Sequence, residues 1–311
     1  MLKEIFLTPE VFLESNMSVS NFYNLKSLLE NISRSGFVLS LENRDWVRCV
    51  LSNISSCARH KDQLLKLIEC LKDRERIEFQ PKSGAEPQTE DDWLKIADSI
   101  NSIRSISSIF SYKKTDRTFA LEDLENIDIG DKYGYGGSVT KLKSEKELEK
   151  IFSTVVSYAK KLTIIDPYFY PDVYRYKRTL EIIAKNFGER RNNKTKGSII
   201  IHCKFQIDNY NPWKKRLDKW RSICRHIRSN YGHTLTIYVW KEKQGGIKMH
   251  ERYLVTNQIG LVVGAGLDVN DRSTSEFGLK QYNELNDITS PFDKNNPSFD
   301  LIYETTMQNT K

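Results

Sequence analysis

A histidine and an arginine stand two residues apart in an apolar, strand-like segment that runs from Met249 to Gly266. Because the side chains of a strand alternate between its two faces, we expect His250 and Arg252 to project from the same face. An imidazole can attack phosphorus or protonate a leaving oxygen, and the guanidinium fork of an arginine matches the oxygens of a phosphate. The spacing therefore favours a phosphodiester site on this segment.

The same segment resembles the phospholipase D superfamily motif H-x-K-x(4)-D, with Arg252 at the lysine position and Asn257 at the aspartate position. It is more similar to the phospholipase D-like domain at the C-terminus of certain eukaryotic MIT-domain proteins, in which an H-[DE]-R strand precedes a G-x-G-L-D turn. Here His250-Glu251-Arg252 precedes a turn that ends at Asp268, and the Asp-Pro-Tyr of that domain has its counterpart at Asp166-Pro167-Tyr168. The resemblance covers residues 140 to 311.

This resemblance implies a metal-free mechanism in which one histidine attacks phosphorus and a second protonates the leaving oxygen. Two copies of the motif must then meet. His202 and Lys204 form a candidate second half-site, and a homodimer that pairs two His250 residues is the alternative. Asn257 carries no negative charge to support the histidine. Residues that could replace that support are Glu251, Asp268, Asn283 and Glu284.

The role of His250 has two alternatives to catalysis. The MIT-linked relatives use this fold to bind anionic lipid headgroups, so the site can bind a ligand without turnover. His250 can also serve only as a structural hydrogen-bond partner.

A basic segment from Trp213 to Arg228 has the periodicity of an amphipathic helix. Apolar residues recur on one face, and the cations on the other faces are Lys214, Lys215, Arg216, Arg221, Arg225 and Arg228. Cations that neutralise phosphates release counterions, so this helix is expected to bind a nucleic-acid backbone in a salt-dependent way. The alternative is a core helix with a solvated basic back.

Acidic residues in the N-terminal part could converge on a divalent metal, as they do in small α/β nucleases of the PIN type. The candidates are Glu10, Asp45, Asp91 and Asp92. Carboxylate oxygens suit magnesium or manganese, but acids at helix starts are also expected for capping and dipole reasons. We therefore expect no cofactor, and a divalent metal only if these acids form a site.

The elements that must position these residues alternate between strand and helix, which predicts an α/β fold in both halves. Residues 1–130 form an expected α/β domain, 131–144 a glycine-containing linker, and 145–311 a phospholipase D-like α/β domain. Its expected strands and helices alternate, which favours a mostly parallel sheet. Ligands collect at the carboxyl ends of parallel strands, so Asp166, Lys204 and the end of the motif strand are expected at one edge.

The composition suits a soluble protein with an anionic partner. The 311 residues carry a formal net charge of +7, with 39% hydrophobic and 29% charged residues. No apolar run approaches the roughly 18 residues that cross a bilayer, and the first residues lack the layout of a secretory signal. The odd number of cysteines, five, without a C-x-x-C pair is typical of reduced thiols. We expect a cytoplasmic protein without a membrane span.

These patterns together favour a nucleic-acid phosphodiesterase, or a protein that binds the backbone of DNA or RNA through a remnant of such a site. A role in microbial defence or in a mobile element is the associated hypothesis. The partners expected are nucleic acid, a second copy of the chain, or a larger complex. One alternative is a phospholipid-headgroup-binding adaptor without turnover. The other is an assembly subunit whose basic helix docks an acidic partner.

Overall fold

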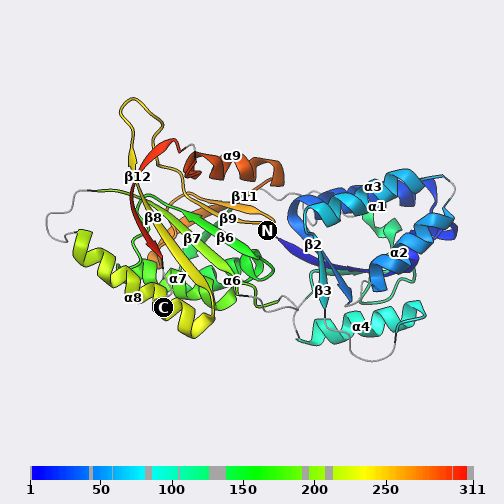
Figure 1. Ribbon diagram of the computed structural model, residues 1–311. Helices are drawn as coiled ribbons and strands as arrows, with labels where there is room; N and C mark the ends of the chain where they lie inside the picture. The colour runs from blue at the N-terminus through cyan, green and yellow to red at the C-terminus, as the bar shows by residue number, and fades with distance from the viewer. Residues whose placement is uncertain are drawn as a thin grey trace. The chain divides into compact units, whose positions relative to one another are not determined.

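The computed structural model describes residues 2–41, 45–57, 59–80, 86–103, 106–125, 138–190, 196–206, 213–295 and 297–306. The chain divides into two units, Met1–Gly136 and Gly137–Lys311, and each has its own sheet (Figure 1). Both units combine helices with a sheet, which confirms the α/β expectation.

The N-terminal unit has a four-stranded parallel sheet in the order β3-β2-β1-β4. Its strands are β1 (Lys3–Leu7), β2 (Gly36–Leu41), β3 (Ile77–Gln80) and β4 (Ser108–Phe110). The connecting helices are α1 (Val19–Ser35), α2 (Asp45–Ser56), α3 (Lys61–Asp73) and α4 (Glu90–Ile103), with 3-10 turns η1 (Pro9–Phe12), η2 (Glu14–Asn16) and η4 (Leu121–Glu125). All of β2 is buried, as expected for a central strand of a parallel sheet.

The C-terminal unit has an eight-stranded sheet in the order β12-β8-β7-β6-β9-β10-β11-β5. The strands are β5 (Val139–Lys143), β6 (Lys161–Ile165), β7 (Ser198–Lys204), β8 (Thr234–Glu242), β9 (Tyr253–Thr256), β10 (Gly260–Val263), β11 (Asn270–Lys280) and β12 (Phe299–Thr306). Only β6, β7 and β8 pair in parallel among these strands, so the expected mostly parallel sheet is wrong. Short connections join β9, β10 and β11, and such connections allow only antiparallel pairing.

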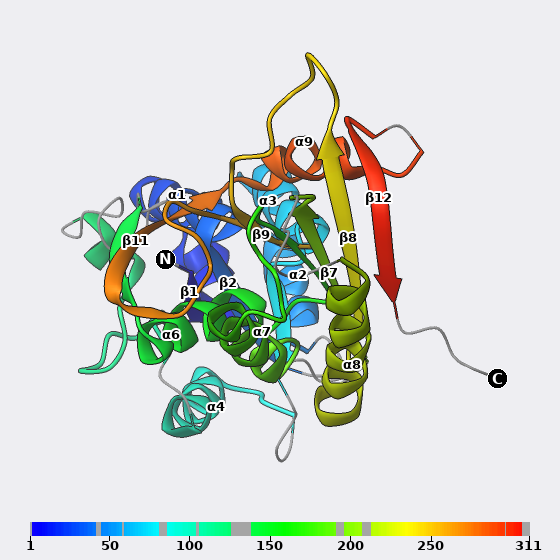
Figure 2. The same cartoon turned by 90° about the vertical axis from the view of Figure 1, so that its left-hand side faces the viewer.

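Two layers cover this sheet. The helices α6 (Glu145–Val156), α7 (Tyr174–Asn186) and α8 (Trp213–Tyr231) lie on one face, and the short elements η5 (Tyr282–Glu284), α9 (Leu285–Thr289) and η6 (Ser290–Phe292) lie on the other (Figures 1 and 2). On the α9 face, Ile165 packs with Trp240, Met249 and Phe299. Neighbouring residues of one strand therefore face different layers, and this alternation decides which side chains can meet.

Part of the linker expected over residues 131–144 is a strand of the sheet. Residues 131–137 lie outside the described part of the chain, whereas Val139–Lys143 forms β5 and pairs with β11. Ser144 then caps α6, because its hydroxyl accepts a hydrogen bond from the backbone N–H of Glu147 at 3.3 Å. The glycines before β5 favoured a linker, so this strand was not expected. Lys143, its last residue, is buried in the interior of the unit.

Candidate functional site

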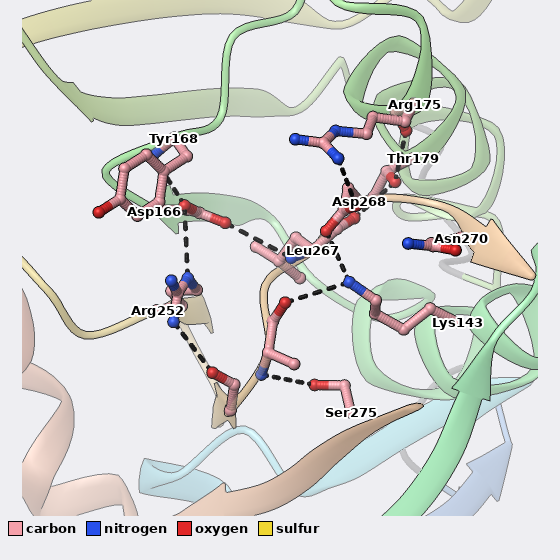
Figure 3. Close-up of polar contacts among 12 residues, drawn as sticks. Lys143, Asp166, Tyr168, Arg175, Thr179, Arg252, Leu267, Asp268, Asn270 and Ser275 are labelled. Carbon is pink, nitrogen blue, oxygen red and sulfur yellow. Dashed lines mark hydrogen bonds and ion pairs between the residues drawn. The ribbon is translucent and has the colours of Figure 1, made fainter. Parts of the chain in front are cut away.

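Asp166 follows β6 directly and is fully buried. Its Oδ1 accepts a hydrogen bond from the backbone N–H of Tyr168 at 2.9 Å, and its Oδ2 accepts one from the N–H of Leu267 at 3.4 Å (Figure 3). The Nε of Arg252 lies 3.8 Å from Oδ1. Burial raises the pKa of Asp166, and the Tyr168 hydrogen bond and the charge of Arg252 offset part of that rise.

Arg252 is held in place by the glycine-containing turn that follows β10. Its Nη1 donates to the carbonyl oxygen of Gly264 at 2.9 Å, and its guanidinium carbon lies 5.5 Å from the centre of the Tyr168 ring. Gly266 in this turn has φ +93°, a conformation that favours glycine, and a Cβ there would come within 3.2 Å of the Asp268 carboxylate. The glycine therefore lets the turn close around the arginine.

Asp268 is the second buried carboxylate of the site. The Nζ of Lys143 lies 2.7 Å from its Oδ1 and also donates to the carbonyl oxygen of Ala265 at 3.1 Å. Nη1 of Arg175, at the start of α7, lies 3.5 Å from its Oδ2. Thr179 on the same helix donates to the carbonyl oxygen of Leu267 at 2.5 Å (Figure 3). These contacts join the turn, β5 and α7 into one polar network.

We call this network the Arg252 cluster; it consists of Lys143, Asp166, Tyr168, Arg175, Arg252 and Asp268. Its two carboxylates and Lys143 are buried, whereas the side chain of Arg175 is 55% exposed, Tyr168 is 44% exposed and the side chain of Arg252 is 25% exposed. The part that meets solvent is therefore cationic and aromatic. Such a surface can bind an anion, with the buried acids fixing the direction of the cations.

His250 does not join the Arg252 cluster. Its imidazole is 71% exposed, with Nδ1 3.1 Å from the carbonyl oxygen of Lys248 and Nε2 3.2 Å from a carboxylate oxygen of Glu251. It lines a pocket on the α9 side of the sheet together with Tyr253. The expectation of a shared face with Arg252 is wrong, because the consecutive residues Ile247 to Glu251 before the strand all line this pocket, whereas Arg252 does not.

The candidate second half-site is also away from the Arg252 cluster. His202 is buried on the α9 side, where its Nδ1 accepts a hydrogen bond from the indole N–H of Trp240 at 2.9 Å and its ring stacks on Phe292. Burial lowers the pKa of His202 to about 3, and the charge of Lys161 adds to the effect. The Nζ of Lys204 lies 2.8 Å from a carboxylate oxygen of Glu242. His202 is thus a neutral core side chain.

Asn257 lies at the opposite end of the motif strand. Its Oδ1 accepts hydrogen bonds from the backbone N–H groups of Lys160 at 2.8 Å and Lys161 at 3.4 Å. These groups lie at the start of β6, whereas Asp166 follows its end. Of the predicted catalytic residues, the structure therefore brings together Arg252, Asp166 and Asp268, and it separates His250 and Asn257 from them.

Helix α8 turns one of its predicted ligand-binding cations inward. Arg216 is buried, with Nη1 3.3 Å from Asp172 and its guanidinium 4.5 Å above the Tyr170 ring, so its expected solvent-facing position is wrong. The indole N–H of Trp220 donates to the same Asp172 at 2.7 Å. The cations that remain exposed are Lys214, Lys215, Lys219, Arg221 and Arg225, whereas Arg228 is half-buried. These contacts attach α8 to the loop that follows Asp166.

The N-terminal acids engage in pairing and capping. Asp45 is buried and pairs with Arg48, Asp92 caps α4 through Thr89, and the carboxylate of Asp91 lies 3.8 Å from the Nζ of Lys113. Burial raises the pKa of Glu10, and the charge of Glu90 adds to the rise. Within the described ranges, no group of three or more His, Cys, Asp or Glu side chains is arranged to hold a metal.

Sequence reasoning missed Lys143, Tyr168 and Arg175 as members of the site. Tyr168 had a signal, because it belongs to the Asp-Pro-Tyr segment that follows β6. Lys143 and Arg175 had none, since each meets Asp268 only through the fold.

No protein-family model, curated protein or solved structure matches the chain. The resemblance to the phospholipase D superfamily therefore depends on the quoted motifs alone. In the part of the chain that the structure describes, no helix combines the length and apolarity that crossing a membrane requires.

Proposed function

We propose that the C-terminal unit, as a phospholipase D-like domain, binds the phosphate backbone of nucleic acid at the Arg252 cluster without cleaving it. The observation that carries this proposal is the pair of partly exposed guanidinium groups, Arg252 and Arg175, held by the buried carboxylates of Asp166 and Asp268. Arginine binds phosphate oxygens through paired hydrogen bonds, and fixing the guanidinium in advance lowers the entropy cost of binding.

A polymeric ligand explains the exposed cations of α8. Lys214, Lys215, Lys219, Arg221 and Arg225 are distributed along a helix of 19 residues, which is about 28 Å long at 1.5 Å per residue. The start of this helix is joined to the loop after Asp166 through Asp172. A single lipid headgroup occupies one site, whereas a chain of phosphates can contact the cluster and the helix together. This favours nucleic acid over the headgroup alternative.

The positions of the two candidate histidines support binding without cleavage. The two-histidine mechanism needs both imidazoles at one phosphorus atom. His250 lines a pocket on the α9 side, and His202 is buried and neutral behind Phe292. Within one copy of the chain, the two imidazoles therefore lie outside the Arg252 cluster.

The proposal is tested by fluorescence anisotropy of short labelled DNA and RNA strands between about 50 and 200 mM salt. Arg175→Gln is expected to weaken binding about tenfold, the value of one charged hydrogen bond. The matched control is Lys185→Gln, at the opposite end of the same helix, which is expected to bind like the unmodified chain.

Equal effects of the two substitutions would refute a phosphate site at the Arg252 cluster. Flotation with vesicles of anionic lipid, sensitive to Arg175→Gln and without retention of DNA or RNA, would support the headgroup alternative. Strand cleavage that disappears in His250→Ala would overturn the statement that the unit does not cut.

A further inference from the structure

We infer that the pocket beside His250 receives an unstacked nucleobase, so that the ligand of this protein is a single strand. This inference depends on the proposed function, because the same strand must place its phosphates on the Arg252 cluster. The pocket, called the base pocket below, has a volume of about 370 Å³ and lies between residues 247–253 and the α9–η6 segment. Its apolar part includes Ile165, Ile247, Met249, Tyr253, Phe292 and Phe299.

The base pocket and the Arg252 cluster lie back to back across the ends of two strands. Ile165 lines the pocket, and the next residue, Asp166, belongs to the cluster. Tyr253 likewise lines the pocket, and the preceding Arg252 belongs to the cluster. Consecutive Cα atoms are about 3.8 Å apart. A strand that passes over this edge of the sheet can therefore contact both sites with neighbouring groups.

The residues that line the base pocket favour a neutral, flat base over a phosphate. Its floor is apolar and aromatic, whereas its rim carries Lys248, His250, Glu251, Lys280, Glu284 and Asp287. The rim carries three carboxylates and two lysines, and Lys280 is paired with Glu284 at 3.1 Å, so the pocket offers an anion no net positive charge. A neutral base can bury its flat face there and use its polar edge. The volume falls at the lower end of the range of about 300 to 1,000 Å³ for small-ligand sites.

A base can enter the pocket only if it is unpaired, which excludes the interior of a duplex. Proteins that bind single strands combine cations along the backbone with aromatic rings on which bases stack. Two exposed rings near the cluster, Tyr168 at 44% and Tyr174 at 74% exposure, add such stacking faces. The same edge of the unit thus combines cations, exposed rings and a base-sized recess.

The test compares an intact single strand with an abasic strand of the same length, which keeps the phosphates and lacks the bases. Anisotropy at constant salt is expected to show that the intact strand binds about tenfold tighter or more. Ile247→Asp, at the 53% exposed mouth of the pocket, is expected to remove most of this difference. Ile103→Asp, at an 84% exposed position of the N-terminal unit, adds the same charge and is the matched control.

The outcomes show whether the inference fails alone or together with the proposed function. Equal binding of intact and abasic strands, both weakened by Arg175→Gln, would refute the base pocket and leave phosphate binding in place. Failure of both strands to bind would refute both. Tighter binding of a duplex than of the single strand would also overturn the inference.

A second variant tests the base pocket even if Ile247→Asp fails to fold. His250→Ala alters an exposed rim residue and is expected to weaken the intact strand several-fold while the abasic strand is unaffected. An equal effect on both strands would assign His250 to phosphate contact and contradict its place in the base pocket.

Discussion

At the scale of single residues, burial decides what the charged groups of the C-terminal unit can do. The side chains of Lys143 and Asp268 are 4% and 7% exposed and form an ion pair at 2.7 Å. Burying two charges costs desolvation free energy, and the attraction between the two groups offsets much of that cost. The pair therefore contributes little net stability, and its main effect is to fix the position of the turn. Lys143 donates to the carbonyl oxygen of Ala265 in this turn, and Arg252 donates to that of the neighbouring Gly264.

Removing one partner of this pair is expected to be costly. Lys143→Met removes the buried cation that pairs with Asp268, and we expect a loss of about 3 kcal/mol in the free energy of unfolding. Urea unfolding measures the loss. The control is Lys141→Met, an exposed position on the same strand, where a change within about 0.5 kcal/mol is expected. Similar losses at both positions would contradict the importance of the buried pair.

The buried His202 predicts a pH dependence of stability. Its pKa of about 3 lies below the ordinary value of 6.5, so the unfolded chain binds a proton that the folded chain rejects. The stability contribution is therefore complete above pH 6.5 and is lost as the pH falls toward 3. Between pH 7 and pH 5 the loss is about 2 kcal/mol.

His202→Gln tests this pH dependence, because glutamine can still accept the hydrogen bond from Trp240 but does not titrate. The unfolding free energy of the variant, measured with urea at both pH values, is expected to fall by about 2 kcal/mol less than that of the unmodified chain. Equal pH dependence in the two proteins would show that His202 takes up a proton in the folded state.

At the scale of elements, helix α8 separates a buried arginine from exposed cations. Arg216 faces Asp172 and two aromatic rings, whereas Lys214, Lys215 and Lys219 face solvent within the first two turns. The helix therefore has a buried arginine on the side that packs and lysines on the side that can meet phosphates. Positive charge alone does not distinguish these roles.

Exchanging the three lysines together for glutamine is expected to weaken strand binding about equally for all sequences. Loss of three phosphate contacts lowers the slope of log Kd against log salt by about 2. Arg216→Gln is the contrasting variant, since it should lower the unfolding free energy by removing a buried ion pair with Asp172. An unchanged salt slope in the lysine variant would remove α8 from the binding surface.

At the scale of the whole molecule, the proposed binding surface belongs to the C-terminal unit alone. The N-terminal unit has its own sheet and core, and the acids suggested as metal ligands serve other contacts there. Strand binding is therefore expected to be independent of divalent metal.

This independence is tested with EDTA and with the double variant Glu10→Gln, Asp91→Asn. Neutralising two acids changes the formal net charge from +7 to +9, and we expect screening by salt to keep the effect of this added charge on binding small. Kd is expected to stay within about twofold in both experiments. A loss of binding in EDTA, restored by magnesium, would instead involve the N-terminal acids.

The sequence by itself determined the local features of this protein. The periodicity of apolar residues predicted the helix that begins at Trp213, and Asp166 was expected at the carboxyl end of a strand, where it follows β6. The glycine-containing turn before Asp268 was also visible. These features depend on neighbours within a few residues, so periodicity and turn chemistry are enough to identify them.

Only the tertiary structure decided strand direction, the burial of charges and the membership of the site. Lys143 and Asp268 are separated by 125 positions in the chain, and Asp172 and Arg216 by 44. A pattern of neighbouring residues carries no information on such pairs, because they form only when strands and helices pack. His250 and Arg252 were expected on one face because strand alternation was assumed for both residues. The structure begins β9 only at Tyr253, after both of them, and strand pairing is also decided by the tertiary fold.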